Sequence, residues 1–363
     1  MKLTKKLVAA MCLCLVTTNV LCAATVSGQQ LSESTTTQQN VDVEAERDVL
    51  EFDSTIDEQE RSIMSDIMMT LDKEDRQNVV YITLDGEIYS NRENLKDGME
   101  VQDISATEVE EDDDRLIMDD DREIMGDGPF YRRTSRNGYS RETARVYLPT
   151  NASYKNELKC KGDTEKANDW GETPFIYLGG TCTTKNTGVD AGLQYSNQYD
   201  DWAVSTLVTW YDTTKKGYKS VPKANWLRFK SGQEVFMKFY VNAPNKVTIS
   251  VTGITTNNKK EPVTIVRDAP GWNTAGTGCN VKRLTTIAQY KRNSMGEKYL
   301  YENFSTGSYL RNVKWSGCQI GNKAGSERAW TNNDYAETKP NPANKVTVAN
   351  RTATSETVSI NLK

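Results

Sequence analysis

The sequence predicts a mostly β protein, with an antiparallel β-sandwich or jelly-roll-like C-terminal domain preceded by a small, acidic and partly disordered α+β segment. Three observations predict this fold class. Short runs rich in β-branched and aromatic residues recur after residue 187, separated by turn-forming clusters. The charge changes sign near residue 128, and all seven tryptophans lie beyond that point. An apolar stretch with the character of a leader opens the chain.

Residues 1–24 have the pattern of a signal peptide. Three lysines within the first six residues form the basic region, and "LVAAMCLCLVTTNV" (residues 7–20) forms the apolar region. "CAA" (residues 22–24) supplies the small residues that favour cleavage after Ala24. The apolar run is too short to span a bilayer comfortably, and no later stretch approaches about 18 consecutive apolar residues. We therefore predict a secreted, extracellular protein without a membrane span.

Residues 25–128 form an acidic segment. They contain 31 Asp and Glu against 8 Lys and Arg, whereas residues 129–363 contain 19 against 34. Within residues 54–75, six large apolar side chains share one helical stripe, and Thr55 and Glu58 have the spacing of a capping box. "VVYITLDGEIYSN" (residues 79–91) predicts a hairpin with Asp-Gly at its turn. The polar sequences on either side of these elements predict disorder.

Two roles remain open for the acidic segment. It is either a propeptide that shields the basic half until cleavage, or a permanent spacer that keeps the protein soluble. "YRRTSRNGYSRETAR" (residues 131–145) predicts an exposed, arginine-rich connector over residues 129–145, of the kind that proteases cut. Salt screens exposed charges beyond about 8–10 Å. An intramolecular acidic partner therefore needs close contact with the basic half.

Residues 146–363 form the predicted basic β-sandwich domain. The predicted strands are "GVDAGLQYS", "AVSTLVTW", "EVFMKFYV", "KVTISVTG", "PVTIVR" and "ETVSINL". In "KVTISVTG" (residues 246–253), branched apolar residues alternate with Thr and Ser, which indicates one buried and one wet face. The sequence of residues 279–292 fits either a strand or a short helix.

The chain contains no histidine, which excludes several catalytic classes. Ser-His-Asp and Cys-His nucleophiles, histidine general bases and His-ligated zinc are all ruled out. An EF-hand read from Asp112 or Asp119 fails, because Ile117 or Ile124 stands where that loop requires glycine. We expect no metal site and no cofactor. The basic residues are scattered rather than gathered in a block, so we also expect no nucleic-acid site.

Four cysteines remain after the predicted leader: Cys160, Cys182, Cys279 and Cys318. An even number in an exported chain predicts two disulfides. Three pairings are possible. The sequence does not choose between them, although pairing Cys160 with Cys182 and Cys279 with Cys318 closes fairly short loops.

Three stretches resemble the YrpD-like family of secreted proteins from Gram-positive bacteria. They are "NTGVDAGLQYSNQYDDWAV", "NWLRFKSGQEVFMKFYV" and "NKVTISVTG". The resemblance covers roughly residues 145–363 and does not include the acidic segment. It implies an exported, mostly β domain and assigns no catalytic residue.

The patch "DAGLQYSNQYDDW" (residues 190–202) offers the aromatic and polar side chains that sugar sites use. The candidate ligand-binding residues are Asp190, Gln194, Tyr195, Tyr199, Asp201, Trp202 and Trp226, with Trp210 and Trp272 as possible extensions. The competing interpretation is that most of these aromatic residues fill the core, since a sandwich of this size needs large side chains between its sheets.

Two functions follow from this patch. The leading prediction is a non-catalytic protein that binds a glycan or an anionic cell-envelope polymer. The alternative is a histidine-independent polysaccharide-active enzyme, either a glycoside hydrolase or a lyase. Its nominal catalytic candidates are Asp190, Asp201, Glu234 and Tyr195, and their spacing singles out no pair.

Overall fold

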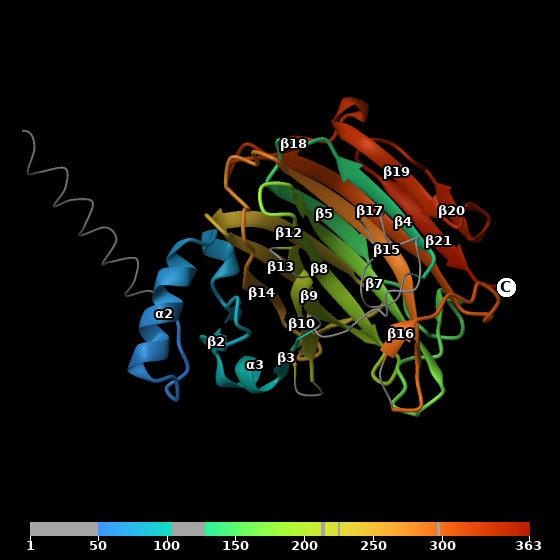
Figure 1. The fold of residues 1–363 in the computed structure, drawn as a ribbon, viewed down its shortest axis with the longest axis horizontal. Helices are drawn as coiled ribbons and strands as arrows, with labels where there is room; N and C mark the ends of the chain where they lie inside the picture. Colours follow the sequence, from blue (N-terminus) through green and yellow to red (C-terminus); the bar gives the residue numbers. More distant parts are fainter. Residues whose placement is uncertain (1–49, 104–127, 212–214, 224–225, 296–297) are drawn as a thin grey trace, which may run out of the picture. The chain divides into compact units, whose positions relative to one another are not determined.

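Two β-sheets form the framework of the computed structural model (Figure 1). The structure describes residues 50–103, 128–211, 215–223, 226–295 and 298–363. The predicted signal peptide, both flanks that the sequence predicts to be disordered and the two Asp runs lie outside the described residues.

Sheet A has 11 strands, of which nine form a continuous path. From one edge to the other these are β2 (Ile88–Ser90), β1 (Val79–Ile82), β14 (Lys260–Asp268), β13 (Lys246–Ile254), β12 (Glu234–Ala243), β5 (Arg141–Tyr147), β17 (Tyr309–Gly321), β21 (Glu356–Asn361) and β20 (Val346–Ala349). The short strands β6 (Leu158–Lys159) and β18 (Arg328–Ala329) also pair with β17.

Sheet B has ten strands. Its path is β19 (Tyr335–Asn341), β4 (Phe130–Ser135), β15 (Cys279–Arg292), β7 (Trp170–Cys182), β8 (Thr187–Ser196), β9 (Asp201–Tyr211), β10 (Lys215–Pro222) and β3 (Met99–Asp103). The strands β11 (Arg228–Lys230) and β16 (Lys298–Leu300) pair with β9 and β15. Short 3-10 turns lie at Lys73–Asp75, Asn332–Asp334 and Ala343–Lys345.

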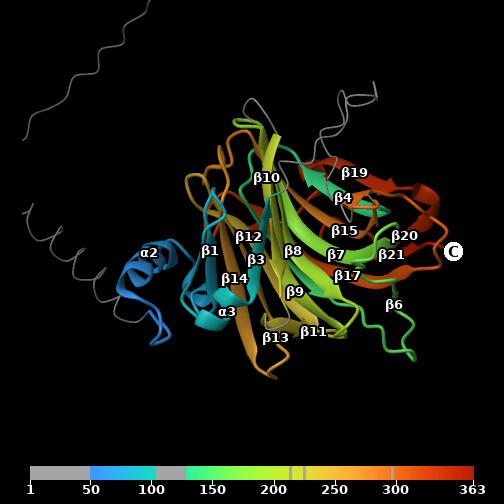
Figure 2. The same cartoon turned by 60° about the horizontal axis from the view of Figure 1, so that its bottom comes forward.

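The predicted antiparallel sandwich is confirmed. Among the described strands every pairing is antiparallel except that of β1 with β14. The two sheets lie as layers over one core, which Figure 2 shows from a second side. Val247, Ile249 and Val251 point into that core and are at most 2% exposed, as the alternation in β13 predicts. The predicted wet face is wrong, because Thr248 and Ser250 are also buried and Ser250 donates a hydrogen bond to Asp75 of the acidic segment. Residues 279–292, left open between strand and helix, form β15.

The helix predicted in the acidic segment is present as α2 (Glu58–Met69). Its buried stripe, including Met64, Ile67 and Met68, packs on Tyr240 and Val266 on the outer face of sheet A. The predicted capping box is wrong: Asp57 is the N-cap, and its carboxylate accepts the amide of Glu60 at 2.8 Å. Aspartate is among the favoured N-cap residues because its side chain satisfies a free amide of the first turn.

The predicted hairpin is also present, as β1 and β2. Gly86 adopts φ +87° at its turn, a conformation that glycine reaches without strain. The short helix α3 (Glu93–Asp97) and β3 follow. Val80 and Ile82 of β1, with Leu95 and Met99, belong to the main core cluster.

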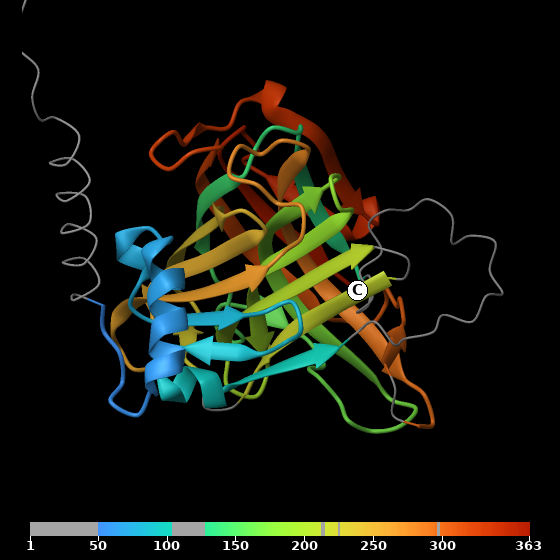
Figure 3. The same cartoon turned by 60° about the vertical axis from the view of Figure 1, so that its left-hand side comes forward.

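The boundary predicted at residue 128 is wrong for residues 50–103, because this part of the acidic segment joins both sheets. Strand β1 pairs in parallel with β14 of sheet A, and β3 pairs with β10 of sheet B. Figure 3 shows these N-terminal strands beside the strands of the basic half. The described residues accordingly all belong to one compact unit. Local sequence did not reveal this, because it does not show which strand edges are open for pairing.

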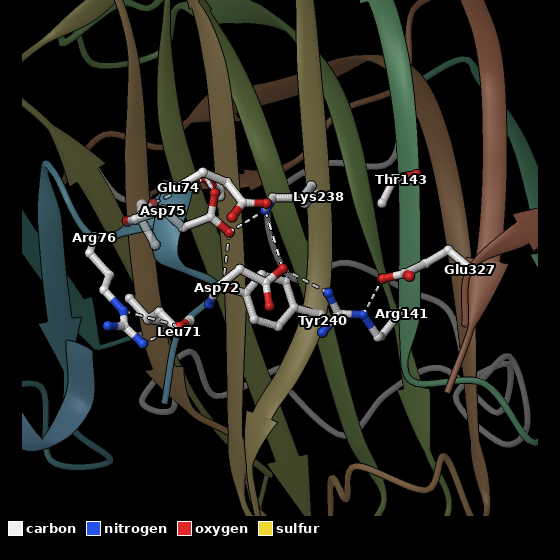
Figure 4. Close-up of polar contacts among 12 residues, drawn as sticks. Leu71, Asp72, Glu74, Asp75, Arg76, Arg141, Thr143, Lys238, Tyr240 and Glu327 are labelled. Atoms are coloured by element: carbon white, nitrogen blue, oxygen red, sulfur yellow. Dashed lines mark hydrogen bonds and ion pairs between the residues drawn. The ribbon is translucent and has the colours of Figure 1, made fainter. Parts of the chain in front are cut away.

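Carboxylates of the acidic segment reach cations on the outer face of sheet A (Figure 4). Lys238 Nζ lies 2.6 Å from Asp75, 3.0 Å from Glu74 and 3.2 Å from Asp72. Arg141 contacts Asp72 at 2.8 Å. Asp75 is fully buried and also accepts the hydroxyls of Tyr240 and Ser250. The close contact expected of an acidic intramolecular partner is therefore present at these residues.

The exposed connector predicted for residues 129–145 is wrong. Its residues form β4 and β5, which lie inside the two sheets. Arg132, Arg133 and Arg141 are at most 6% exposed. Each pairs with a carboxylate: Arg132 with Glu337 at 2.7 Å, Arg133 with Glu356 at 3.0 Å and Arg141 with both Asp72 and Glu327. Burial of arginine is tolerated because these partners compensate its charge.

A charged cluster lies between the sheets. Glu356 accepts hydrogen bonds from Arg283 at 2.8 Å, from Arg133 at 3.0 Å and from the Tyr131 hydroxyl at 3.0 Å. Glu142 is fully buried nearby, with its carboxylate 3.7 Å from Arg283. Burial raises the pKa of Glu142 to about 8.

All four predicted disulfide cysteines are buried thiols in the structure. Cys182 in β7 lies directly opposite Cys279 in β15, so the register brings together two residues that the short-loop pairing separates. The Cys279 amide donates to Gly276 and its carbonyl accepts from Gly138. The two cysteines thus occupy a position without mutual backbone hydrogen bonds, where cross-strand side chains approach most closely.

Candidate functional site

A pocket of about 420 Å³ opens beside the ends of β7, β8 and β10. Its walls come from the loop between β6 and β7, the start of β7, the end of β8 with its following turn, and β9 to β11. The polar lining residues include Lys161, Asp163, Glu172, Thr173, Gln194, Tyr195, Ser196, Asn197, Gln198, Tyr199 and Arg228. Amides, carboxylates and cations thus converge from segments far apart in the sequence.

The turn after β8 carries the aromatic rim of the pocket. Tyr199 is 45% exposed, one of few large apolar side chains that the described surface leaves open to this extent. Asp200 holds the turn: its carboxylate accepts the Thr150 hydroxyl at 2.7 Å and the Asn151 amide at 3.0 Å. The Tyr195 hydroxyl donates to Asp200 at 3.0 Å. These bonds fix the rim from behind and leave the Tyr199 ring accessible.

Glu172 is a fully buried carboxylate in the pocket wall. One oxygen accepts the Gln289 amide at 2.8 Å and the Thr306 hydroxyl at 2.7 Å, and the other accepts the Lys161 backbone amide at 3.1 Å and the Ser308 hydroxyl. Four donors therefore occupy both oxygens. These hydrogen bonds tie the loop between β6 and β7 to the pocket wall. Glu172 is therefore better suited to positioning other residues than to proton transfer.

Arg228 and Asp201 form an ion pair at the pocket edge. Arg228 lies 3.2 Å from Asp201, and its guanidinium is 5.3 Å from the centre of the Tyr199 ring. Burial raises the pKa of Asp201 to about 6, although Arg228 opposes this shift. Within the described part of the chain, Arg228 Nε and Gln194 Oε1 are buried without a hydrogen-bond partner. Both atoms belong to residues that line the pocket.

The structure divides the predicted ligand-binding residues into three groups. Gln194, Tyr195 and Tyr199 line the pocket, whereas Asp201 is not a lining residue and pairs with Arg228, which is one. Asp190 pairs with Lys282 at 2.8 Å and is not a lining residue. The tryptophans are wrong as ligand contacts, because all four are core residues, as the competing interpretation held: Trp202, Trp210, Trp226 and Trp272. Indole rings fill the large spaces between the sheets.

Sequence reasoning missed several lining residues. Asn197 and Gln198 lie inside the quoted patch, and their place in a turn between two predicted strands was a usable signal. Lys161, Glu172 and Arg228 come from other parts of the chain, so only long-range strand pairing places them here.

The nominal catalytic candidates do not converge. Glu234 lies in sheet A and pairs with Arg145 at 3.4 Å, away from Asp190 and Asp201 in sheet B. Burial and the nearby Asp200 carboxylate raise the pKa of Tyr195 well above its usual value, so its hydroxyl stays protonated at neutral pH. Burial likewise raises the pKa of the lining Cys160 to about 12, which disfavours a thiolate nucleophile.

Within the described residues, no group of His, Cys, Asp and Glu side chains is arranged to hold a metal ion. The same residues include no helix that is both long and apolar enough to cross a membrane.

No family model and no curated protein matches the chain. Among solved structures, it is similar to the scytalido-glutamic peptidase, with a TM-score of 0.36 and 10% identity over 64% of this chain and 98% of that one. Tailspike protein 2 of bacteriophage CBA120 gives a TM-score of 0.28 and 11% identity over 55% and 29% of the two chains. The PL-14 alginate lyase from Aplysia kurodai gives 0.18 and 9% over 43% and 71%. Similarity at these TM-scores does not establish a shared fold or function.

Proposed function

We propose that this chain is a secreted, non-catalytic glycan-binding protein and that the pocket at the end of β8 holds the sugar. The observation that carries the proposal is the combination of the Tyr199 rim with Gln194 Oε1 and Arg228 Nε, two buried polar atoms without partners among the described residues. An unpaired buried acceptor or donor costs about 1–3 kcal/mol. A ligand hydroxyl that pairs with either atom recovers part of this cost.

The remaining lining residues suit a sugar as well. Asn197, Gln198 and Asp163 are exposed and offer amide and carboxylate groups to hydroxyls at the rim. The apolar face of a pyranose ring can stack on Tyr199, as aromatic side chains commonly do with apolar ligand surfaces. Secretion follows from the predicted signal peptide and places the pocket where envelope or environmental glycans occur.

One observation favours the enzymatic alternative. Glu172 and Asp163 both line the pocket, and a glycoside hydrolase needs two carboxylates beside one sugar. Against this, both oxygens of Glu172 are already occupied by four donors, and Asp163 lies 3.3 Å from the Lys298 ammonium. Binding without turnover is therefore the better-supported function.

A glycan array with the full-length protein tests the proposal, followed by titration calorimetry on the best neutral oligosaccharide. Loss of the stacking ring in Tyr199→Ala should weaken binding about three- to tenfold, because such aromatic contacts contribute about 0.5–1.5 kcal/mol. Tyr154→Ala is the matched control, since Tyr154 is 85% exposed and is not a lining residue. If no glycan binds, or if both variants bind equally, the proposal is wrong.

Reducing-sugar and unsaturated-product assays on the bound glycan separate the two functions. We expect no turnover by the wild-type protein. Turnover that disappears in Asp163→Asn, while the variant still binds the glycan, would establish the enzyme instead.

A further inference from the structure

A second surface lies on the outer face of sheet A, where three half-buried aromatic rings each lie close to a basic side chain. We call it the basic-aromatic face and define it by Tyr147, Phe236, Tyr309, Arg145, Lys314 and Arg311. The register places these residues on one side of the sheet: Arg145 is opposite Phe236, and Tyr147 is opposite Lys314. The intervening Ala144 and Val146 are fully buried on the opposite, core side.

Each ring of this face has a cation within 6 Å. Arg145 lies 5.6 Å from the Phe236 centroid, Lys314 lies 5.4 Å from Tyr147, and Arg311 lies 4.0 Å from Tyr309. Lys155 and Lys363 add further cations, at 5.5 Å from Tyr147 and 5.8 Å from Tyr309. Such contacts hold the ammonium and guanidinium groups in place along the strands.

Acidic groups only partly offset this charge. Glu234 pairs with Arg145 at 3.4 Å, but both side chains are more than half exposed, so water screens the pair. Glu157 is nearly buried and is occupied by the Tyr147 hydroxyl at 3.0 Å. The face therefore keeps a net positive charge.

Elsewhere on the outer face of sheet A, carboxylates of this chain form ion pairs with the basic side chains. Lys238 and Arg141 lie farther along β12 and β5, on the same outer side, and Asp72, Glu74 and Asp75 of this chain cover them. In the part of the chain that the structure describes, no carboxylate forms an ion pair with Lys314 or Arg311 at the other end. The carboxylates of the acidic segment thus neutralise the cations at one end of this face, and Lys314 and Arg311 at the other end have no such partner among the described residues.

Hydroxyl and amide groups lie beside the cations. Ser316, Thr357 and Ser359 are half-buried and Gln319 is exposed, all on the outer side of β17 and β21. These neutral donors and acceptors match sugar hydroxyls, which a phosphate polymer without sugars lacks.

We propose that the basic-aromatic face binds an acidic polysaccharide built of uronic acids. The carboxylates of the polysaccharide form ion pairs with the cations of the face, and its hydroxyls form hydrogen bonds with the Ser, Thr and Gln side chains. This site is separate from the sugar pocket, which is built mainly from strands of sheet B, so either can fail without the other.

The test measures binding of polygalacturonate to the full-length protein by calorimetry. The double variant Arg145→Gln/Lys314→Gln removes two exposed cations of the face. Lys259→Gln/Lys323→Gln is the control, because both lysines are exposed in turns and the change in net charge is the same. Exposed ionic contacts contribute about 0.2–1 kcal/mol each, so the first variant should bind about two- to thirtyfold more weakly and the control should be unchanged. Circular dichroism confirms that both variants remain folded.

Four further measurements separate the outcomes. Raising the salt from about 0.05 to 0.5 M should weaken the binding, since it shortens the Debye length. The pocket variant Tyr199→Ala should keep the affinity of the wild type. Neutral dextran and long-chain polyphosphate should bind at least tenfold more weakly than polygalacturonate. Equal losses in the two double variants, equal binding of polyphosphate, or dependence on Tyr199 would each overturn the proposal.

Discussion

Replacing Lys238 by methionine should sharply destabilise the attachment of the acidic segment to sheet A. Lys238 is 6% exposed and lies within 3.2 Å of Asp72, Glu74 and Asp75. Removing one partner of a buried ion pair typically costs about 3–5 kcal/mol, because the other charge stays buried without compensation. Asp75 keeps the hydroxyls of Tyr240 and Ser250, so we expect a loss near the lower end, about 3 kcal/mol.

The loss of unfolding free energy in Lys238→Met should become smaller as the pH is lowered. Burial raises the pKa of Asp75 above its usual value even though Lys238 lowers it. Without Lys238 the pKa of Asp75 should rise further. Lowering the pH then protonates Asp75 in the folded variant and removes the uncompensated charge, so the difference from wild type should shrink between pH 7 and pH 4.

Urea denaturation followed by tryptophan fluorescence measures these changes. The control is Arg145→Met, which breaks the exposed pair with Glu234 and should cost less than about 1 kcal/mol. Asp75→Asn combined with Lys238→Met should cost less than the sum of the two single changes. If Lys238→Met costs no more than Arg145→Met, the buried network does not hold the acidic segment and the reasoning is refuted.

Three other predictions follow from the structure. The folded protein holds a proton on Glu142, whose pKa is about 8, whereas the unfolded chain loses it near the usual glutamate value. Stability should therefore fall as the pH rises from about 4.5 to 8, and Glu142→Gln should flatten this dependence in urea titrations; an unchanged slope would contradict the assignment. When the reduced protein is treated with cystine, Cys182 and Cys279 should each lose one hydrogen and join, while cystine is reduced to two cysteines. Peptide mapping should then find this one link, with Cys160 and Cys318 as thiols; any other pairing would contradict the β7–β15 register. Trypsin should spare the bonds after Arg132, Arg133, Arg141 and Arg145 in the native protein, because they lie within β4 and β5; N-terminal sequences starting there would show that these strands open.

The strands of the basic half were predictable because each carries its own alternation. Val247, Ile249 and Val251 alternate with Thr and Ser, so the face of β13 that points into the core follows from the sequence, although the burial of Thr248 and Ser250 on the other face does not. The helical stripe of α2 and the hairpin of β1 and β2 were predictable for the same reason. Local periodicity records which side of an element is buried.

The candidate site was only partly predictable. The patch of residues 190–202 does contribute Gln194 and Tyr199 to the pocket, but Trp202 from the same patch is core. Adjacent residues of a strand point to opposite faces, and an aromatic residue fits either environment. Glu172 and Arg228 carried no local signal, because their place in the pocket depends on how β7, β9 and β11 pair.

The sequence by itself determined the β class, the two oppositely charged halves and the absence of histidine chemistry. Only the tertiary structure decided that residues 50–103 complete both sheets and that the arginines of residues 129–145 are buried against carboxylates. Composition and periodicity act over a few residues and can be read locally. Strand pairing and charge compensation join residues far apart in the sequence, such as Val79 with Thr264 and Arg133 with Glu356, so their outcome appears only once the chain is folded.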